Sequence, residues 1–115
     1  MSNSTAIALP VNRLIERHHG DNHGNPYELI RLADRWAYTE ILRDGRVVSA
    51  GTDMLGFYWA VCDRPGSADG SDRLESAGYM SLAAALEDLR EQFLDEFSIE
   101  WTMPKIVHTT TAADD

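Results

Sequence analysis

The sequence predicts an α+β domain in which an antiparallel β-meander of three to four strands packs against a long C-terminal amphipathic helix, with a short N-terminal helix. Apolar residues repeat at helical spacing from Ser81 to Phe97, which indicates the long helix. Asp44-Gly45 stands between two runs rich in β-forming residues, which is typical of a hairpin. The chain has 115 residues, of which 43% are hydrophobic, enough for one core and too few for two.

A single domain is therefore expected over residues 10–103. A flexible N-terminus at 1–9 and a disordered acidic tail at 104–115 are expected to flank it, because termini that are not tied down order poorly. Pro10 opens a short helical pattern that Gly20 ends, and this pattern predicts the N-terminal helix. Its spaced positions are Val11, Leu14, Ile15 and His18.

Turn-forming residues fill 20–26 and predict a loop ahead of the sheet. Residues rich in β-branched and aromatic side chains follow, and they predict the strands of the meander. These strands are expected at 27–33, 36–43, 46–51 and 55–62. A helix over 27–42 is an open alternative, since several apolar residues there also keep helical spacing; these are Leu29, Ala33, Trp36 and Ala37.

The register of the central hairpin depends on the length of its turn. A two-residue turn at Asp44-Gly45 pairs Leu42 with Val47, and it pairs Ile41 with Val48. The same turn sets Arg43 opposite Arg46, a like-charge contact that a longer loop relieves.

Ser81 supplies an N-cap for the long helix. One stripe of this helix is apolar and predicts its buried side, formed by Leu82, Leu86, Leu89, Phe93 and Phe97. The opposite side is acidic and is expected to face solvent or a partner; we call it the acidic helix face, formed by Glu87, Asp88, Glu91 and Asp95. Residues 63–76 are expected to form a long exposed loop, and 99–103 a short strand.

Several short motifs together resemble a known family. They are Tyr27-Glu28-Leu29, a second strand that starts at Trp36, the hairpin 43–48, and Gly78-Tyr79-Met80-Ser81 at the entry to the helix. This pattern resembles the small bacterial YegP-like domains over residues 27–89, with 52–76 as an insertion. The resemblance implies a strand meander closed by a helix and no established chemistry. Phage integrase arm-type domains are similar in layout, but they are basic where this chain is acidic.

The negative charge is concentrated in one half of the chain. Residues 67–115 carry a net charge of −8 out of the total of −9. Such a charge repels nucleic acid and anionic lipid and attracts basic protein surfaces. On the acidic helix face, carboxylates one helical turn apart approximate the phosphate spacing of a nucleic-acid strand. In size and charge the chain is similar to small acidic phage proteins that inhibit restriction or CRISPR complexes.

We therefore expect a non-enzymatic, acidic protein-binding module. Its function would be that of a mobile-element inhibitor, similar to anti-CRISPR proteins, whose acidic helix face mimics nucleic acid and occupies a basic protein surface. The expected binding residues are Glu87, Asp88, Glu91 and Asp95. No catalytic motif, cofactor, direct nucleic-acid contact or membrane contact is expected. A homodimer through the aromatic strand Phe57-Tyr58-Trp59 is a further expectation, because both faces of that strand are apolar.

Cysteine content and hydropathy indicate the compartment. Cys62 is the only cysteine and ends an apolar run, which predicts a buried, unreactive thiol. No secretory signal pattern is present, and the longest apolar runs are far shorter than a membrane span. We therefore expect a cytoplasmic protein, with the host cell of a phage as one setting.

Three other roles remain open. The first is a nucleic-acid-binding module that uses arginines; the candidates are Arg13, Arg17, Arg31, Arg35, Arg43 and Arg46. The second is a metal-dependent enzyme that uses His18, His19 and His23, which lie close together in the sequence with Asp21 among them. A purely structural or interaction role is a third possibility.

Overall fold

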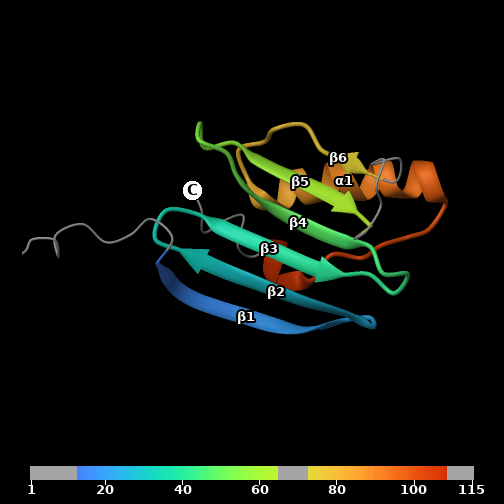
Figure 1. The fold of residues 1–115 in the computed structure, drawn as a ribbon, viewed down its shortest axis with the longest axis horizontal. Helices are drawn as coiled ribbons and strands as arrows, with labels where there is room; N and C mark the ends of the chain where they lie inside the picture. Colours follow the sequence, from blue (N-terminus) through green and yellow to red (C-terminus); the bar gives the residue numbers. More distant parts are fainter. Residues whose placement is uncertain (1–12, 65–72, 109–115) are drawn as a thin grey trace, which may run out of the picture.

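The computed structural model describes residues 13–64 and 73–108, which form one antiparallel sheet and one long helix (Figure 1). The sheet has six strands in meander order, so each strand pairs with its neighbours in the sequence. The strands are β1 (Leu14–Asn22), β2 (Asn25–Leu32), β3 (Trp36–Ile41), β4 (Val47–Thr52), β5 (Tyr58–Asp63) and β6 (Leu74–Glu75), and the helix is α1 (Leu82–Phe97). The α+β meander is confirmed, but the sheet has six strands where three to four were expected.

The first hairpin replaces the expected N-terminal helix and the expected loop at 20–26, so both predictions are wrong for the described residues. The strands β1 and β2 are joined by a two-residue turn at His23-Gly24, whose φ angles are 53° and 96°. Two positive φ angles define a type I′ turn, which matches the twist of the flanking strands. Pro26 is tolerated in β2 because its nitrogen points away from β1, and the pairing of β2 with β3 begins only at Tyr27. The expected helix start at Pro10 and Val11 lies outside the described residues.

The hairpin between β3 and β4 has the longer turn. The backbone N–H of Leu42 donates to the carbonyl of Arg46 at 2.8 Å, which leaves the three residues 43–45 in the loop. Gly45 adopts a φ of 95°, as a three-residue loop of this kind requires. Ile41 therefore pairs with Val47, not with Val48, and the two arginines do not face each other. The helical alternative for 27–42 is wrong.

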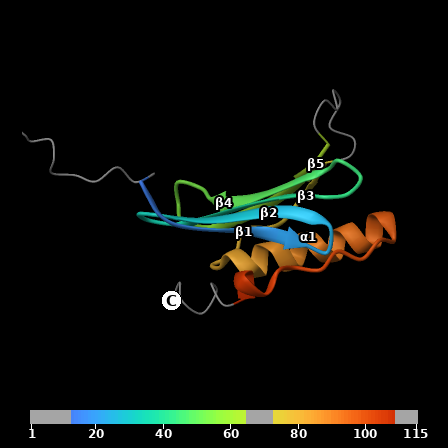
Figure 2. The same cartoon turned by 90° about the horizontal axis from the view of Figure 1, so that it is seen from below.

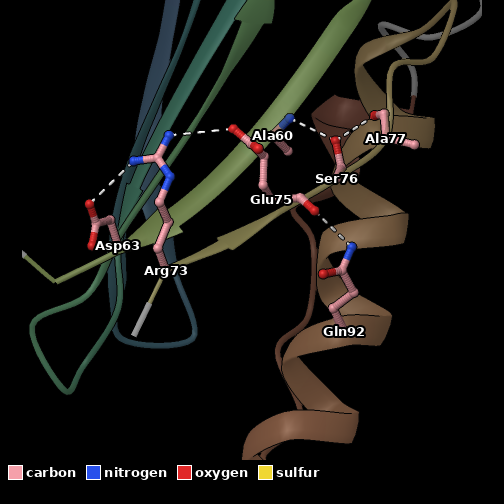
Figure 3. Close-up of polar contacts among 7 residues, drawn as sticks. All are labelled: Ala60, Asp63, Arg73, Glu75, Ser76, Ala77 and Gln92. Carbon is pink, nitrogen blue, oxygen red and sulfur yellow. Dashed lines mark hydrogen bonds and ion pairs between the residues drawn. The ribbon is translucent and has the colours of Figure 1, made fainter. Parts of the chain in front are cut away.

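The strand β5 lies inside the sheet, between β4 and β6 (Figure 1). Its outer edge pairs with β6 at Val61 and Cys62 and with Tyr79 at Tyr58, and the expected homodimer through Phe57-Tyr58-Trp59 stays a prediction. The predicted loop 63–76 contains β6, and residues 65–72 of that loop lie outside the described residues. Ser76, which follows β6, is hydrogen-bonded to β5. Its Oγ accepts from the N–H of Ala60 at 2.9 Å and donates to the carbonyl of Ala77 at 2.7 Å (Figure 3).

The helix α1 has a serine cap at each end. The hydroxyl of Ser81 accepts from the N–H of Ala84 at 3.2 Å, which confirms the predicted N-cap. Ser98 ends the helix in the left-handed conformation with a φ of 55°, and its N–H donates to the carbonyl of Leu94. The predicted stripe faces the sheet: four of its side chains are buried and Phe97 is half-buried.

The segment after α1 covers the other half of the same sheet face. It runs back behind β3 and β2, on the side of the sheet where α1 lies (Figures 1 and 2). Residues 99–103 were expected to form a strand but pair with no strand of the described sheet. Trp101, Met103 and Val107 are buried, so the core continues past the expected domain end at 103 through a helical turn at 105–108. The expected flexible N-terminus at 1–9 and residues 109–115 of the expected tail 104–115 lie outside the described residues.

Cys62 lies in the core, as predicted, and burial raises the pKa of its thiol to about 11. A thiol reagent at pH 8 should therefore label the native protein at least roughly a hundredfold more slowly than the denatured protein, because thiolate is scarce. Since the folded pKa is raised, this group stabilises the fold below its unfolded pKa of about 9, and this contribution is lost as pH rises towards 11. The Cys62→Ala variant should show a shallower loss of stability over this pH range; an equal loss would contradict the assignment.

Candidate functional site

Three of the four residues of the acidic helix face lie on the exposed side of α1, opposite the side chains that the helix buries in the core. Glu87, Glu91 and Asp95 follow one another at four-residue spacing, so their side chains form a row along the helix. All three are exposed. Within residues 13–64 and 73–108, no lysine or arginine forms an ion pair with them. The nearest basic group is the imidazole of His108, whose Nδ1 lies 4.0 Å from a carboxylate oxygen of Glu87.

Asp88, the fourth predicted residue of this face, is half-buried and turned towards the segment that enters the helix. Its carboxylate accepts from the backbone N–H of Ala77 at 3.0 Å and from the amide of Gln92 at 3.4 Å. Gln92 also donates to the carbonyl of Glu75 at 3.0 Å, which ties β6 to the helix (Figure 3). Partial desolvation and the hydrogen bond to Asp88 raise the pKa of the Tyr79 hydroxyl. Asp88 therefore holds the fold together, and the open row is Glu87, Glu91 and Asp95.

The row of carboxylates is unfavourable for the helix that carries it. Like charges at i,i+4 each destabilise a helix by about 0.2–0.5 kcal/mol. Asp95 and Glu96 also lie in the last turn, which contains no basic residue, next to the negative end of the helix dipole. The chain therefore keeps these acids in positions where they reduce stability.

A hollow of about 180 Å³ borders the row between α1 and the segment that follows it. Leu94 supplies an exposed apolar wall, and the carboxylates of Glu91 and Glu100 border the same hollow. Arg90 also lines the hollow, and one of its terminal nitrogens donates to the carbonyl of Trp101 at 3.4 Å. This arrangement suits a lysine or arginine side chain, whose aliphatic stem packs on apolar surface while its charged end meets carboxylates.

Glu40 was not among the predicted functional residues, and its carboxylate is completely inaccessible to solvent. One of its oxygens accepts from the amides of Asn22 and Asn25 at 3.2 and 2.8 Å and from the indole N–H of Trp101 at 3.0 Å. The other accepts from the hydroxyl of Tyr38. Burial, together with this hydrogen bond, raises the pKa of the Tyr38 hydroxyl. These four donors, which we call the Glu40 network, join β1, β2, β3 and the C-terminal segment at one point.

The sequence did contain a signal for this network. Trp36, Tyr38 and Glu40 alternate along one strand, so a period of two places Glu40 on the buried face with the two aromatic residues. A cavity of about 330 Å³ adjoins the network, with Asn22, Asn25 and Trp101 in its wall. The charged residues at this cavity are of both signs; they are Arg43, Asp44 and Glu100.

The six arginines considered for nucleic-acid binding do not gather on one exposed face. Arg17 pairs with Glu28 at 2.5 Å, and Arg35 pairs with Asp34 at 2.9 Å. Arg46 is buried, where it pairs with Asp44 and lies 3.9 Å from the ring centroid of Phe97. The remaining three are exposed at separate places: Arg13 before β1, Arg31 beside Trp36 and Arg43 against the first turn.

The histidines considered for metal binding are also separated. His18 and His19 are adjacent in β1, so their side chains point to opposite faces of the sheet. His18 stacks near Trp36 at a centroid distance of 6.5 Å, and His23 lies in the turn. In the part of the chain that the structure describes, no three or more His, Cys, Asp or Glu side chains converge as metal ligands do.

Comparison with known proteins gives no relative. No family model matches the chain, and no curated protein or solved structure matches it. The resemblance to YegP-like domains and to phage inhibitors therefore stays a prediction. Among the described residues, α1 and the short helical turn both fall short of the length and apolar character that a transmembrane helix needs.

Proposed function

We propose that this protein is a non-enzymatic binding module whose acidic helix face docks on a basic surface of a nucleic-acid-handling protein. The observation that carries the proposal is the exposed row of Glu87, Glu91 and Asp95, which no arginine or lysine among the described residues neutralises. Each carboxylate repels its neighbour, and the last one opposes the helix dipole. A binding role gives a reason for charges that the fold itself does not need.

The partner is expected to present lysine or arginine side chains at the spacing of phosphate groups. Such a surface binds nucleic acid largely through its charge, and a row of carboxylates competes for the same side chains. The hollow beside Glu91 and Glu100 would hold one of these side chains at the centre of the contact, and exposed Leu94 would pack on its stem.

The test is affinity capture from a host lysate at low and at high salt, with the native chain and the Glu91→Lys variant. We expect a captured protein with the native chain at low salt, release of that protein at high salt, and at least a tenfold loss with Glu91→Lys. The matched control is Glu16→Lys, which makes the same change of charge on exposed β1. Equal capture by Glu91→Lys and the native chain at low salt would refute the proposal.

The same row predicts an unusual effect on stability. Replacing Glu91 with glutamine removes the repulsion with both neighbours in the row, so the folded state should gain about 0.4–1 kcal/mol at low salt. Chemical denaturation at low and high salt measures this gain, which should shrink as salt screens the charges. A loss of stability on this substitution would mean that Glu91 has a favourable partner within the fold.

A further inference from the structure

The strand β1 is one of the two edges of the sheet that residues 13–64 and 73–108 form. It is nine residues long and pairs with β2 on one side, and in the described sheet it is the first strand in the order. The two-residue turn makes Asn22 and Asn25 a hydrogen-bonded pair, and the pairing alternates from there along the hairpin. The N–H and C=O groups of Arg17, His19 and Asp21 therefore point away from β2. An edge of this kind is a template for another strand.

We propose that two copies of this chain associate by antiparallel pairing of their β1 edges. The second copy is the occupant that the charges of this strand favour. Only residues whose N–H and C=O groups point away from β2 can form hydrogen bonds across the edge. Arg17, His19 and Asp21 of one chain must therefore lie opposite residues of this same set in the other chain. When His19 faces His19 of the second copy, Arg17 of each chain lies opposite Asp21 of the other. Asp21 is exposed and forms no ion pair with another described residue.

Registers shifted by two residues lose both Arg17–Asp21 ion pairs. One such shift sets Asp21 against His19 and places Arg17 opposite His23 in the turn. The opposite shift sets Arg17 against His19 and Asp21 against Ile15. A further shift sets Arg17 against its own copy, which is repulsive. In the proposed register, residues 16–22 of each chain pair over seven positions, and the guanidinium of Arg17 bridges between Glu28 of its own chain and Asp21 of the other.

The distribution of charge permits this contact. Residues 13–32 contain three basic and three acidic side chains, so this segment carries no net charge although the whole chain is strongly acidic. The helix α1 packs on β4, β5 and β6, at the far end of the sheet from β1. Pairing along β1 therefore keeps the two acidic helix faces apart and leaves both open.

His19→Pro tests the proposal, because the N–H of His19 points away from β2 and proline there removes no bond within the chain. Sedimentation equilibrium over a hundredfold concentration range should show a dimer for the native chain and a monomer for His19→Pro. His19→Thr keeps the N–H and should remain dimeric. Circular dichroism checks that each variant is folded; if His19→Pro unfolds, Asp21→Arg serves instead and should weaken association at least tenfold.

Cysteine cross-linking tests the register. In the proposed dimer, residue 19 lies opposite its own copy at a Cα distance of about 5.5 Å, which a disulfide spans. His19→Cys should therefore cross-link under oxidising conditions, and Cys62 does not interfere because it is buried. Arg17→Cys is the control, since the two copies of residue 17 are about 13 Å apart. A monomeric native chain, a dimeric His19→Pro, or equal cross-linking of the two cysteine variants would overturn the proposal.

Discussion

Replacing Glu40 with leucine is expected to destabilise the folded domain by at least about 4 kcal/mol. The substitution leaves four donors without this acceptor, three on buried residues and one on half-buried Asn25, and each unpaired buried donor costs about 1–3 kcal/mol. A domain of this size has a total stability of about 5–15 kcal/mol, so a large part of it would be lost. Urea unfolding followed by tryptophan fluorescence measures the change, since Trp101 belongs to the network.

Two variants make this measurement specific. Glu40→Gln keeps the size of the side chain and one strong acceptor, so we expect a smaller loss of about 1–2 kcal/mol. Thr39→Val changes the exposed neighbour of Glu40 and should be close to neutral. If Glu40→Leu were as stable as the native chain, the free-energy cost of burying the carboxylate would cancel the stabilisation from its four hydrogen bonds. The network would then make no net contribution to the stability of the fold.

Replacing Trp101 with alanine is expected to destabilise the domain by about 3–5 kcal/mol, the range for large aromatic side chains in a core. Trp101 is buried, packs against the ring of Phe93 at 6.1 Å and donates to Glu40. Its loss would release the C-terminal segment from the sheet. Thermal unfolding and hydrogen exchange of the amides in β2 and β3 measure this effect.

The contribution of packing can be separated from that of the hydrogen bond. Trp101→Phe keeps an aromatic ring beside Phe93 but removes the indole N–H, so we expect a loss of about 1–2 kcal/mol. Thr102→Ala changes the exposed neighbour and serves as the control. If Trp101→Ala were no more destabilising than Thr102→Ala, residues 99–108 would not be the second cover of the sheet.

The helix and the middle of the sheet could be predicted because their patterns are complete in the sequence. The stripe from Leu82 to Phe97 has an N-cap residue at its start, and the structure confirms both. In β3, β4 and β5 one face is buried and the other is not, so apolar residues alternate as a period of two requires. The register of the β3–β4 hairpin shifted by one residue because Asp44-Gly45 fits a two-residue and a three-residue turn equally well.

The first strand could not be predicted in the same way. Almost all of β1 is exposed on both faces, so no alternation marks it, and Leu14 and Ile15 fit a helix as well as a strand. Its turn contains His23 where asparagine or aspartate is usual, so the sequence lacks the usual signal of a hairpin at this position. The segment 99–108 covers the core without forming a strand or a long helix. Neither the helical nor the strand repeat of apolar residues detects such a segment.

The candidate site was predictable in its position and not in its details. The apolar stripe alone places Glu87, Glu91 and Asp95 on the outer side of the helix. Asp88 is at the edge of that face, and only the fold shows that the backbone N–H of Ala77 binds it. The hollow next to Glu91 depends on where residues 99–102 lie after the helix ends at Ser98, and no pattern in the sequence gives that path.

The most direct test of the proposed mimicry is displacement of the captured partner by nucleic acid. The purified complex, held on the immobilised native chain at low salt, is washed with a duplex DNA or an RNA oligonucleotide. If the row of Glu87, Glu91 and Asp95 occupies a nucleic-acid groove, the oligonucleotide should release the partner, and adding free chain should in turn remove oligonucleotide from the partner. A stable ternary complex of chain, partner and oligonucleotide would contradict the account.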